Sequence, residues 1–399
     1  MKRASRTGGS FFARRGRCGG KNAALAPPRL VCYDEAHAEK SRQREGVRPV
    51  SLSVQILKKL DEYTLNVKLE TAGERTALLG ASGSGRTAAL RCIAGFDTPD
   101  RGRIVLNDRV LFDSEKRINL SPRRRHIGFL FPDYALFPHM TVRQNLLAAA
   151  QTLPQEKRAA AVNEALRSFR LEAEEARFPG ELSGVERRRA ALARMLLTEP
   201  EALLLDEPFA AIDAHLRWQA ELELSELLRG YDGDVLLSTS DRGEACRLCE
   251  TVSVFSNGNA GRKTEVRELL YDPGTVSAAQ VSGCENFSRI RRVDPMHVRC
   301  LSWGVTLRTS EPVENAVTYV GVHASSFHIA AGGEPNRFDA RVMRVIEDAF
   351  STIVLLSPES GSSLLRMELP RAAGRGIKTG DLVLLGVAPE RVLPLTGDF

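Results

Sequence analysis

The feature that most constrains the fold is a short apolar run that enters a glycine-rich segment. Residues Thr76–Leu79 are typical of a buried strand, and residues 88–94 form an apolar helical pattern that stops at Gly95. Between them stand Gly80, Ala81, Ser82, Gly83, Ser84, Gly85, Arg86 and Thr87. In such a strand–loop–helix unit, the backbone N–H groups of the loop and the helix N-terminus bind phosphate. We therefore predict an α/β domain in which this glycine-rich loop (residues 80–87) holds a phosphorylated ligand.

The residue types of the glycine-rich loop fit this chemistry. The glycines allow the backbone to close around phosphate oxygens, and the Thr87 hydroxyl is placed to bind Mg²⁺. Arg86 stands where the motif has lysine, so a planar fork replaces a compact ammonium of the same charge. The alternative is a Gly/Ser turn that binds nothing, and the strand–loop–helix context favours phosphate over it.

A second strand pattern ends in two acids. Residues 202–205 are apolar, and Asp206, Glu207 and Pro208 follow them. A carboxylate at such a strand end can hold Mg²⁺, so Asp206 is a candidate metal ligand. Glu207 is the candidate catalytic residue, which would orient or deprotonate an attacking water. The alternative is a pair of acids that only cap the strand, and the glycine-rich loop about 120 residues earlier weakens it.

A third motif, Leu182-Ser183-Gly184-Val185, opens a helical pattern that continues to Leu196. Taken alone, Ser183 is a helix N-cap. The order of the three motifs resembles that of the ATP-binding-cassette (ABC) ATPases. In that family, the Leu-Ser-Gly-Gly signature of one subunit closes over ATP held in the loop of another. The resemblance therefore implies that Ser183 and Gly184 bind nucleotide in a homodimer or heterodimer.

The resemblance extends from Val50 to the end of the chain, over about 350 residues. Tyr63 looks like the aromatic residue that stacks on adenine, and Asp213 looks like the aspartate of the loop after the two acids. Residues 131–142 resemble the glutamine-loop segment, and residues 238–244 resemble the switch-histidine segment. Residues 103–120 are most similar to those of the molybdate-importer ATPases.

The resemblance carries a set of expectations. It implies a P-loop ABC ATPase domain with a helical subdomain over residues 50–283, with ATP and Mg²⁺ as cofactors. It also implies membrane permease subunits as partners, a peripheral position on the cytoplasmic face of the cell membrane, and ATP-driven import of a molybdate-like oxyanion. An importer ATPase for another small solute is an alternative. An ABC protein of DNA repair or translation is disfavoured, because only about 96 residues separate the loop from the signature and there is one cassette.

Four positions depart from the family pattern, namely Arg86, Pro132, Val185 and Ser240. Pro132 replaces a glutamine that contacts the metal and the attacking water, and proline has neither a side-chain donor nor an N–H. Val185 replaces the second glycine of the signature, and Ser240 replaces a histidine that bridges the γ-phosphate and the catalytic acid. We therefore expect nucleotide binding with slow hydrolysis. The alternative function is a degenerate pseudoenzyme that binds ATP with little turnover.

After residue 283, short strand-like segments alternate with turns of Gly, Pro and Ser. The clearest of them are residues 316–323, 340–346, 352–356, 364–369 and 382–385. They predict a small β-barrel domain over residues 284–399. This domain resembles the oligomerising, oxyanion-associated (Mop/TOBE-like) domain of molybdate-importer ATPases, which implies an oxyanion site. The alternative is a regulatory barrel that binds nothing.

Charge divides the chain near residue 49. Residues 1–49 carry a net charge of +8, and the other 350 residues carry −2. The folded part is therefore not expected to bind nucleic acid. Residues 1–49 lack periodicity and predict a disordered basic extension, with translation starting naturally at Val50. The alternative for this extension is binding to anionic lipid or RNA.

The remaining polar groups have simple interpretations. Cys246 and Cys249 predict two thiols on a helix face, because no second pair or paired histidine follows them. The runs 123–125 and 187–189, three arginines each, predict solvated faces. Seven thinly spread cysteines do not form a disulfide framework, and no apolar stretch reaches the roughly 18 to 20 residues of a membrane span.

Overall fold

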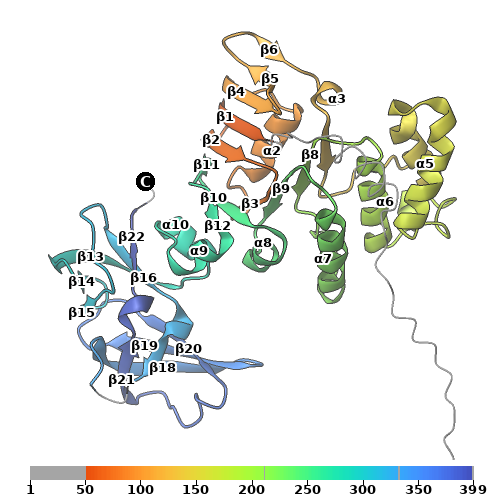
Figure 1. Ribbon diagram of the computed structural model, residues 1–399. Coiled ribbons are helices and arrows are strands. Elements are labelled where there is room, and N and C mark those ends of the chain that lie inside the picture. Colours follow the sequence, from red (N-terminus) through yellow and green to blue (C-terminus); the bar gives the residue numbers. More distant parts are fainter. Residues whose placement is uncertain (1–50, 211, 331–332, 398–399) are drawn as a thin grey trace, which may run out of the picture.

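The computed structural model describes residues 51–210, 212–330 and 333–397. These residues form two parts, a mixed α/β part and an all-β part that follows it (Figure 1). The predicted extension over residues 1–49, and the start proposed at Val50, lie outside the described residues.

One large sheet runs through the α/β part. Its strands are β1 (Leu52–Lys59), β2 (Thr64–Thr71), β3 (Arg75–Gly80), β4 (Arg101–Leu106), β5 (Arg109–Asp113), β6 (Ile118–Asn119), β7 (Ile127–Leu130), β8 (Ala202–Asp206), β9 (Asp234–Thr239), β10 (Thr251–Ser256), β11 (Asn259–Ala260) and β12 (Thr264–Glu265). The order is β6-β5-β4-β1-β2-β11-β10-β3-β9-β8-β7, and β12 pairs with β10. Strands β10, β3, β9, β8 and β7 are parallel, so their carboxyl ends meet at one edge.

The helices cover both faces of the parallel strands. They are α2 (Arg86–Ala94), α3 (Pro122–Arg125), α4 (Val142–Ala149), α5 (Gln155–Ser168), α6 (Gly184–Leu196), α7 (Ala214–Arg229), α8 (Arg242–Leu248), α9 (Val266–Tyr271) and α10 (Val276–Val281). In β8, Leu204 packs with α2, whereas Leu203 and Leu205 pack with α6 and α7. Successive side chains of a strand point to opposite faces, so a continuous apolar run is buried on both sides.

The predicted helical subdomain is present. Helices α4, α5 and α6 share a small core of their own at one end of the α/β part, seen at the right of Figure 1. Helix α6 begins where the sequence predicts, because Ser183 caps it, and α2 ends at Gly95, which has a left-handed φ of 87°.

The all-β part consists of two five-stranded antiparallel sheets around one core. Its strands are β13 (Asn286–Asp294), β14 (His297–Cys300), β15 (Val305–Arg308), β16 (Tyr319–Val322), β17 (Phe327–Ile329), β18 (Arg337–Glu347), β19 (Ser351–Pro358), β20 (Leu365–Pro370), β21 (Leu382–Val387) and β22 (Leu393–Leu395). The orders are β15-β14-β13-β16-β22 and β17-β21-β18-β19-β20. Side chains of both sheets, such as Val320 and Leu356, share this core with Trp303. This architecture confirms the predicted small barrel.

The first strands of this part were not predicted. The sequence places the first clear strand at residues 316–323, whereas β13, β14 and β15 precede it and the strand there is shorter, Tyr319–Val322. The reason is visible in β13, where most residues are exposed and three are arginines, so the apolar alternation of a half-buried strand is missing.

Two arginine predictions are wrong. Arg125 is fully buried and donates hydrogen bonds to the carbonyl oxygens of Cys92, Ile93 and Leu120. Arg188 is also fully buried and donates to Ala220 O and to Glu223. Each run therefore has one arginine inside the protein, because the buried acceptors come from elements that are distant in sequence.

The thiols are also placed differently from the prediction. Cys246 is exposed on α8, but Cys249 forms the C-cap of that helix, and burial raises its pKa. Within the described ranges, the cysteines are free and no group of three or more His, Cys, Asp or Glu side chains could hold a metal ion. A search of the same residues finds no helix that is both long enough and apolar enough to cross a membrane.

Candidate functional site

The glycine-rich loop joins β3 to α2, and its shape depends on glycine. A Cβ atom at Gly80 would lie 2.4 Å from the Phe255 carbonyl oxygen, and Gly85 has a φ of 106°. Side chains other than hydrogen would clash at the first position and be strained at the second. The rim of the loop, Ala81 to Gly83, is exposed, whereas Ser84 is buried and its Oγ has no partner.

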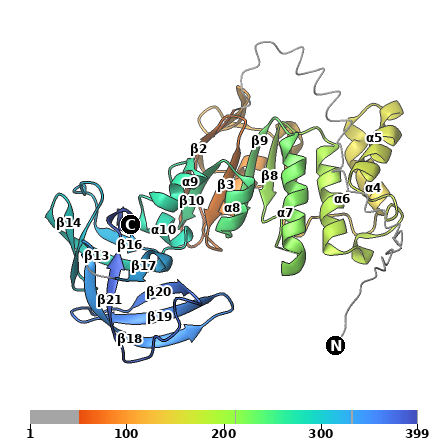
Figure 2. The same cartoon turned by 60° about the horizontal axis from the view of Figure 1, so that its bottom comes forward.

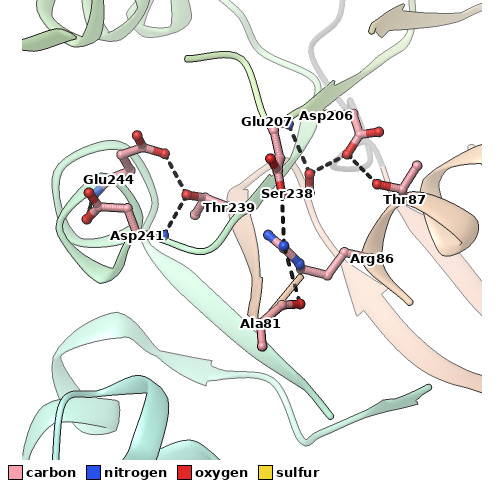
Figure 3. A network of polar contacts seen from close by, with 9 residues as sticks. All are labelled: Ala81, Arg86, Thr87, Asp206, Glu207, Ser238, Thr239, Asp241 and Glu244. Carbon is pink, nitrogen blue, oxygen red and sulfur yellow. Dashed lines mark hydrogen bonds and ion pairs between the residues drawn. The ribbon is translucent and has the colours of Figure 1, made fainter. Parts of the chain in front are cut away.

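Asp206 lies at the end of β8, beside the first turn of α2. The Thr87 hydroxyl donates to Asp206 Oδ1 at 3.0 Å, and the Ser238 hydroxyl donates to the same oxygen at 2.5 Å (Figure 3). The second oxygen, Oδ2, is buried and has no partner. Burial raises the pKa of Asp206, although both hydrogen bonds oppose the shift. This set of oxygens suits Mg²⁺, which prefers carboxylate, hydroxyl and water ligands.

Glu207 has an unusual backbone and a cationic partner. Its φ is 43°, in the left-handed region, and its N–H is held by Ser238 Oγ at 3.0 Å. Its Oε1 accepts a hydrogen bond of 2.9 Å from Nη2 of Arg86. Such backbone conformations concentrate at functional sites because the surrounding structure must hold them.

The Arg86 side chain lies between the loop and Glu207, as Figure 3 shows. It is only 4% exposed, and Nη2 also lies 3.4 Å from the Ala81 carbonyl oxygen. The other terminal nitrogen, Nη1, is buried without a partner. The sequence predicts a phosphate-binding charge at this position, but it gives no sign of the ion pair with Glu207.

Tyr63 lies in the bend between β1 and β2, beside the loop. It is half-buried, and its ring lies so close to Gly258 that a Cβ atom there would be 2.3 Å from Tyr63 Cδ2. A Cβ atom at Gly85 would be 3.4 Å from the Tyr63 hydroxyl. The structure therefore brings this predicted residue to the end of the glycine-rich loop.

The signature lies elsewhere in the chain. Ser183 and Glu186 form a capping box, in which the Ser183 hydroxyl accepts from Glu186 N at 3.3 Å and Glu186 accepts from Ser183 N at 2.7 Å. Gly184 follows in the first turn of α6, which packs on the opposite face of β8 from α2 (Figures 1 and 2). Asp213 is exposed at the start of α7. The structure does not bring these three residues to the glycine-rich loop of the same chain.

The other three substituted positions have defined places. Pro132 follows β7 at the sheet edge that also carries Asp206, and Ser240 follows β9 at this edge. Ser240 is exposed, whereas the neighbouring Thr239 donates to the buried Glu244 (Figure 3). Val185 is half-buried in the first turn of α6.

Sequence reasoning missed one residue of this site, Ser238. Its hydroxyl serves both Asp206 and the backbone of Glu207. The available signal was a polar residue that follows the apolar residues 235–237 near the end of a strand. That signal is informative only when β9 is known to lie beside β8, where Ser238 pairs with Asp206.

Comparisons with known proteins agree with this geometry. Residues 63–210 match the family model described as ABC transporter. The molybdenum import ATP-binding protein ModC of Paramagnetospirillum magneticum is 34% identical over 56% of this chain and 61% of the relative. ModC of Rhodospirillum rubrum is 34% identical over 58% and 66%. The spermidine/putrescine import ATP-binding protein PotA of Acidothermus cellulolyticus is 40% identical over 54% and 55%. The matches therefore span less than two thirds of these relatives.

Proposed function

We propose that this chain, whose residues 63–210 match the ABC transporter family model, is the ATP-binding subunit of an importer. The observation that carries the proposal is a convergence of buried polar atoms that have no partner. Ser84 Oγ, Arg86 Nη1 and Asp206 Oδ2 lie where β3 and β8 end, at one sheet edge, although they come from two distant segments. Buried polar groups are normally hydrogen-bonded, so these atoms point to a polar ligand.

Each predicted residue has a role in this proposal. The glycine-rich loop holds the phosphates of ATP through its backbone N–H groups, Ser84 and Arg86. Tyr63 stacks on the adenine. Thr87 and Asp206 hold Mg²⁺, which neutralises phosphate charge when it is bound. Glu207 orients or deprotonates the attacking water.

The active unit in this proposal is a dimer of ATPase subunits, either identical or different. Ser183, Gly184 and Asp213 come to a glycine-rich loop from a second subunit. The position of α6 on the opposite sheet face from α2 supports this arrangement, because the signature is then directed away from the loop of its own chain. Membrane permease subunits complete the importer at the cytoplasmic face of the membrane, and residues 284–399 act as its regulatory domain.

We propose a molybdate-like oxyanion as the transported solute. The ModC relatives and the β-barrel after residue 283 support it. The PotA relative, named for spermidine/putrescine import, supports another small solute as the alternative. Equilibrium dialysis of the full chain against molybdate and tungstate, with spermidine as the control, tests whether the barrel has an oxyanion site. Uptake of neither oxyanion would leave the barrel with a structural role alone.

The second candidate function is a degenerate pseudoenzyme that closes on ATP but hardly hydrolyses it. The ion pair of Arg86 with Glu207 favours it, as do Pro132 and Ser240 at the same edge. Phosphate release under saturating Mg-ATP, with the permease present, decides between the candidates.

Titration calorimetry with Mg-ATP tests the nucleotide site itself. We expect Asp206→Asn and Thr87→Val to weaken binding of Mg-ATP but not of metal-free ATP. Glu201→Gln is a matched control, because Glu201 precedes β8 at its opposite end, where it pairs with Arg109 at 3.0 Å. Absence of ATP affinity in the parent protein would remove the proposed function.

A further inference from the structure

We infer that Arg86 is a positioning residue that ties Glu207 to the glycine-rich loop, and that this ion pair persists when phosphate is bound. The inference rests on the proposed function, since it concerns the same site. It assigns Arg86 a task for which the planar fork of a guanidinium is better suited than a compact ammonium.

The first support is that the two terminal nitrogens of the Arg86 guanidinium have different surroundings. Nη2 donates to Glu207 Oε1 at 2.9 Å and lies 3.4 Å from Ala81 O, whereas Nη1 is buried without a partner. A guanidinium has five N–H donors in a rigid fork, so one nitrogen can bind phosphate while the other keeps Glu207. A lysine ammonium has three N–H donors on one compact nitrogen, so it lacks two separate nitrogens that could hold phosphate and Glu207 apart from each other.

The second support is that Glu207 is held from both ends. Its backbone N–H is bound by Ser238 Oγ at 3.0 Å and its φ is 43°, so the direction in which the side chain leaves the main chain is set. Arg86, 4% exposed, then holds Oε1. The hydrogen bond from Nη2 occupies one acceptor site of Oε1 and fixes the orientation of the carboxylate. As a consequence, the site can still bind phosphate, whereas the carboxylate of Glu207, the candidate base, is held by Arg86.

The third support is the low exposure of the cation. Arg86 is enclosed, whereas Glu207 is 37% exposed. A buried guanidinium without a carboxylate would carry an uncompensated charge, so the pair with Glu207 is favoured in the protein without nucleotide. A phosphate on Nη1 adds a second anion and does not require the first to leave.

A double-mutant cycle tests the pair. The proteins are wild type, Arg86→Gln, Glu207→Gln and the double variant, and the measurement is the thermal midpoint without nucleotide and with a saturating non-hydrolysable ATP analogue and Mg²⁺. We expect each single change to lower the midpoint by about 2–5 °C and the double change to lower it no further, in both conditions. In the control cycle with Glu201→Gln, the effect should add to that of Arg86→Gln, because Glu201 pairs with Arg109 instead.

Each outcome of the cycle has one meaning. Additive effects without nucleotide would overturn the ion pair. Coupling without nucleotide and additive effects with the analogue would overturn its persistence, because phosphate would then displace Glu207. Failure to bind the analogue would remove the proposed function, but the nucleotide-free cycle would still report on Arg86 and Glu207.

Comparing kcat with the KM for ATP distinguishes a positioning role of Arg86 from a purely structural one. The comparison is made in a protein that already carries Pro132→Gln, Val185→Gly and Ser240→His. Adding Arg86→Lys to it should raise kcat at least about tenfold and leave the KM for ATP within about threefold, and Glu207→Gln should remove the gain. Equal kcat with arginine and with lysine would overturn the inference.

Discussion

Thr87 and Asp206 are 119 positions apart, and a hydrogen bond of 3.0 Å joins Thr87 Oγ1 to Asp206 Oδ1. The same oxygen accepts from Ser238, while Oδ2 is buried without a partner. One oxygen therefore holds the loop, the strand β8 and the strand β9 together. The other is left for a ligand, which is Mg²⁺ in the proposed function.

Asp206→Asn is expected to stabilise the nucleotide-free protein at neutral pH. Burial raises the pKa of Asp206 from 3.8, so the ionised form costs stability in the folded state. Below about pH 3.8 the carboxyl is protonated in both the folded and the unfolded protein, so the free energy of unfolding is not reduced. The reduction grows as the pH rises toward the raised pKa of the folded state, and it reaches its full size above that pKa. The variant should therefore have a higher thermal midpoint than wild type at pH 7.5 and nearly the same midpoint at pH 4. The exposed Asp232→Asn is the control, and a lower midpoint at pH 7.5 would contradict the prediction.

Tyr63→Ala is expected to weaken Mg-ATP binding by about 1–3 kcal/mol, the range of base–aromatic stacking. Tyr63 lies at the end of the glycine-rich loop, near Gly85 and Gly258. Tyr63→Phe keeps the ring and should bind within about 0.5 kcal/mol of wild type, a change of the size seen at neutral positions. Calorimetry measures both, and an unchanged affinity of the alanine variant would place adenine elsewhere.

Restoring all four substituted positions should restore turnover. The variant Arg86→Lys, Pro132→Gln, Val185→Gly and Ser240→His should raise kcat at least roughly a hundredfold, whereas single reversions from wild type should do little, because residues that act as a unit are non-additive. Glu207→Gln in the restored protein should abolish the gain. If the unmodified homodimer already releases phosphate at roughly 1 s⁻¹ or more, this interpretation fails.

Arg125→Ala is expected to destabilise the α/β part by about 2–4 kcal/mol. Arg125 donates to Cys92 O and Ile93 O, which are carbonyls of the last turn of α2, and its charge lies at the negative end of that helix. The exposed neighbour Arg124→Ala should change stability by less than about 0.5 kcal/mol. Urea unfolding followed by circular dichroism compares them, and equal effects would show that burial of Arg125 is unimportant.

Local patterns in the sequence determined the framework of this protein. Strand β3, the glycine-rich loop, the cap of α6 and the two acids at the end of β8 depend on neighbours in the chain. The signals are glycine dihedral freedom, apolar runs and a Ser183–Glu186 capping box. Such signals survive without knowledge of the fold. The order of three such motifs was also enough to indicate a resemblance to the ABC ATPases, and residues 63–210 match the ABC transporter family model.

Where the local signal is weak or the partner is distant, tertiary structure decided the outcome. Strand β13 has little apolar alternation and is held by pairing with β14 and β16. Arg125 looks like its exposed neighbours in sequence, and only the approach of the α2 carbonyls buries it.

The same distinction applies to Arg86 and Glu207. Their residue types, and the departure from lysine, are written in the chain, but 121 positions separate them. The parallel pairing of β3 with β9 and of β9 with β8 brings the ends of their strands together, and only then can the guanidinium reach the carboxylate. The sequence determined which charges are present at this site, and the sheet order decided which of them meet, because hydrogen bonds and ion pairs form only between atoms that the fold has brought within reach.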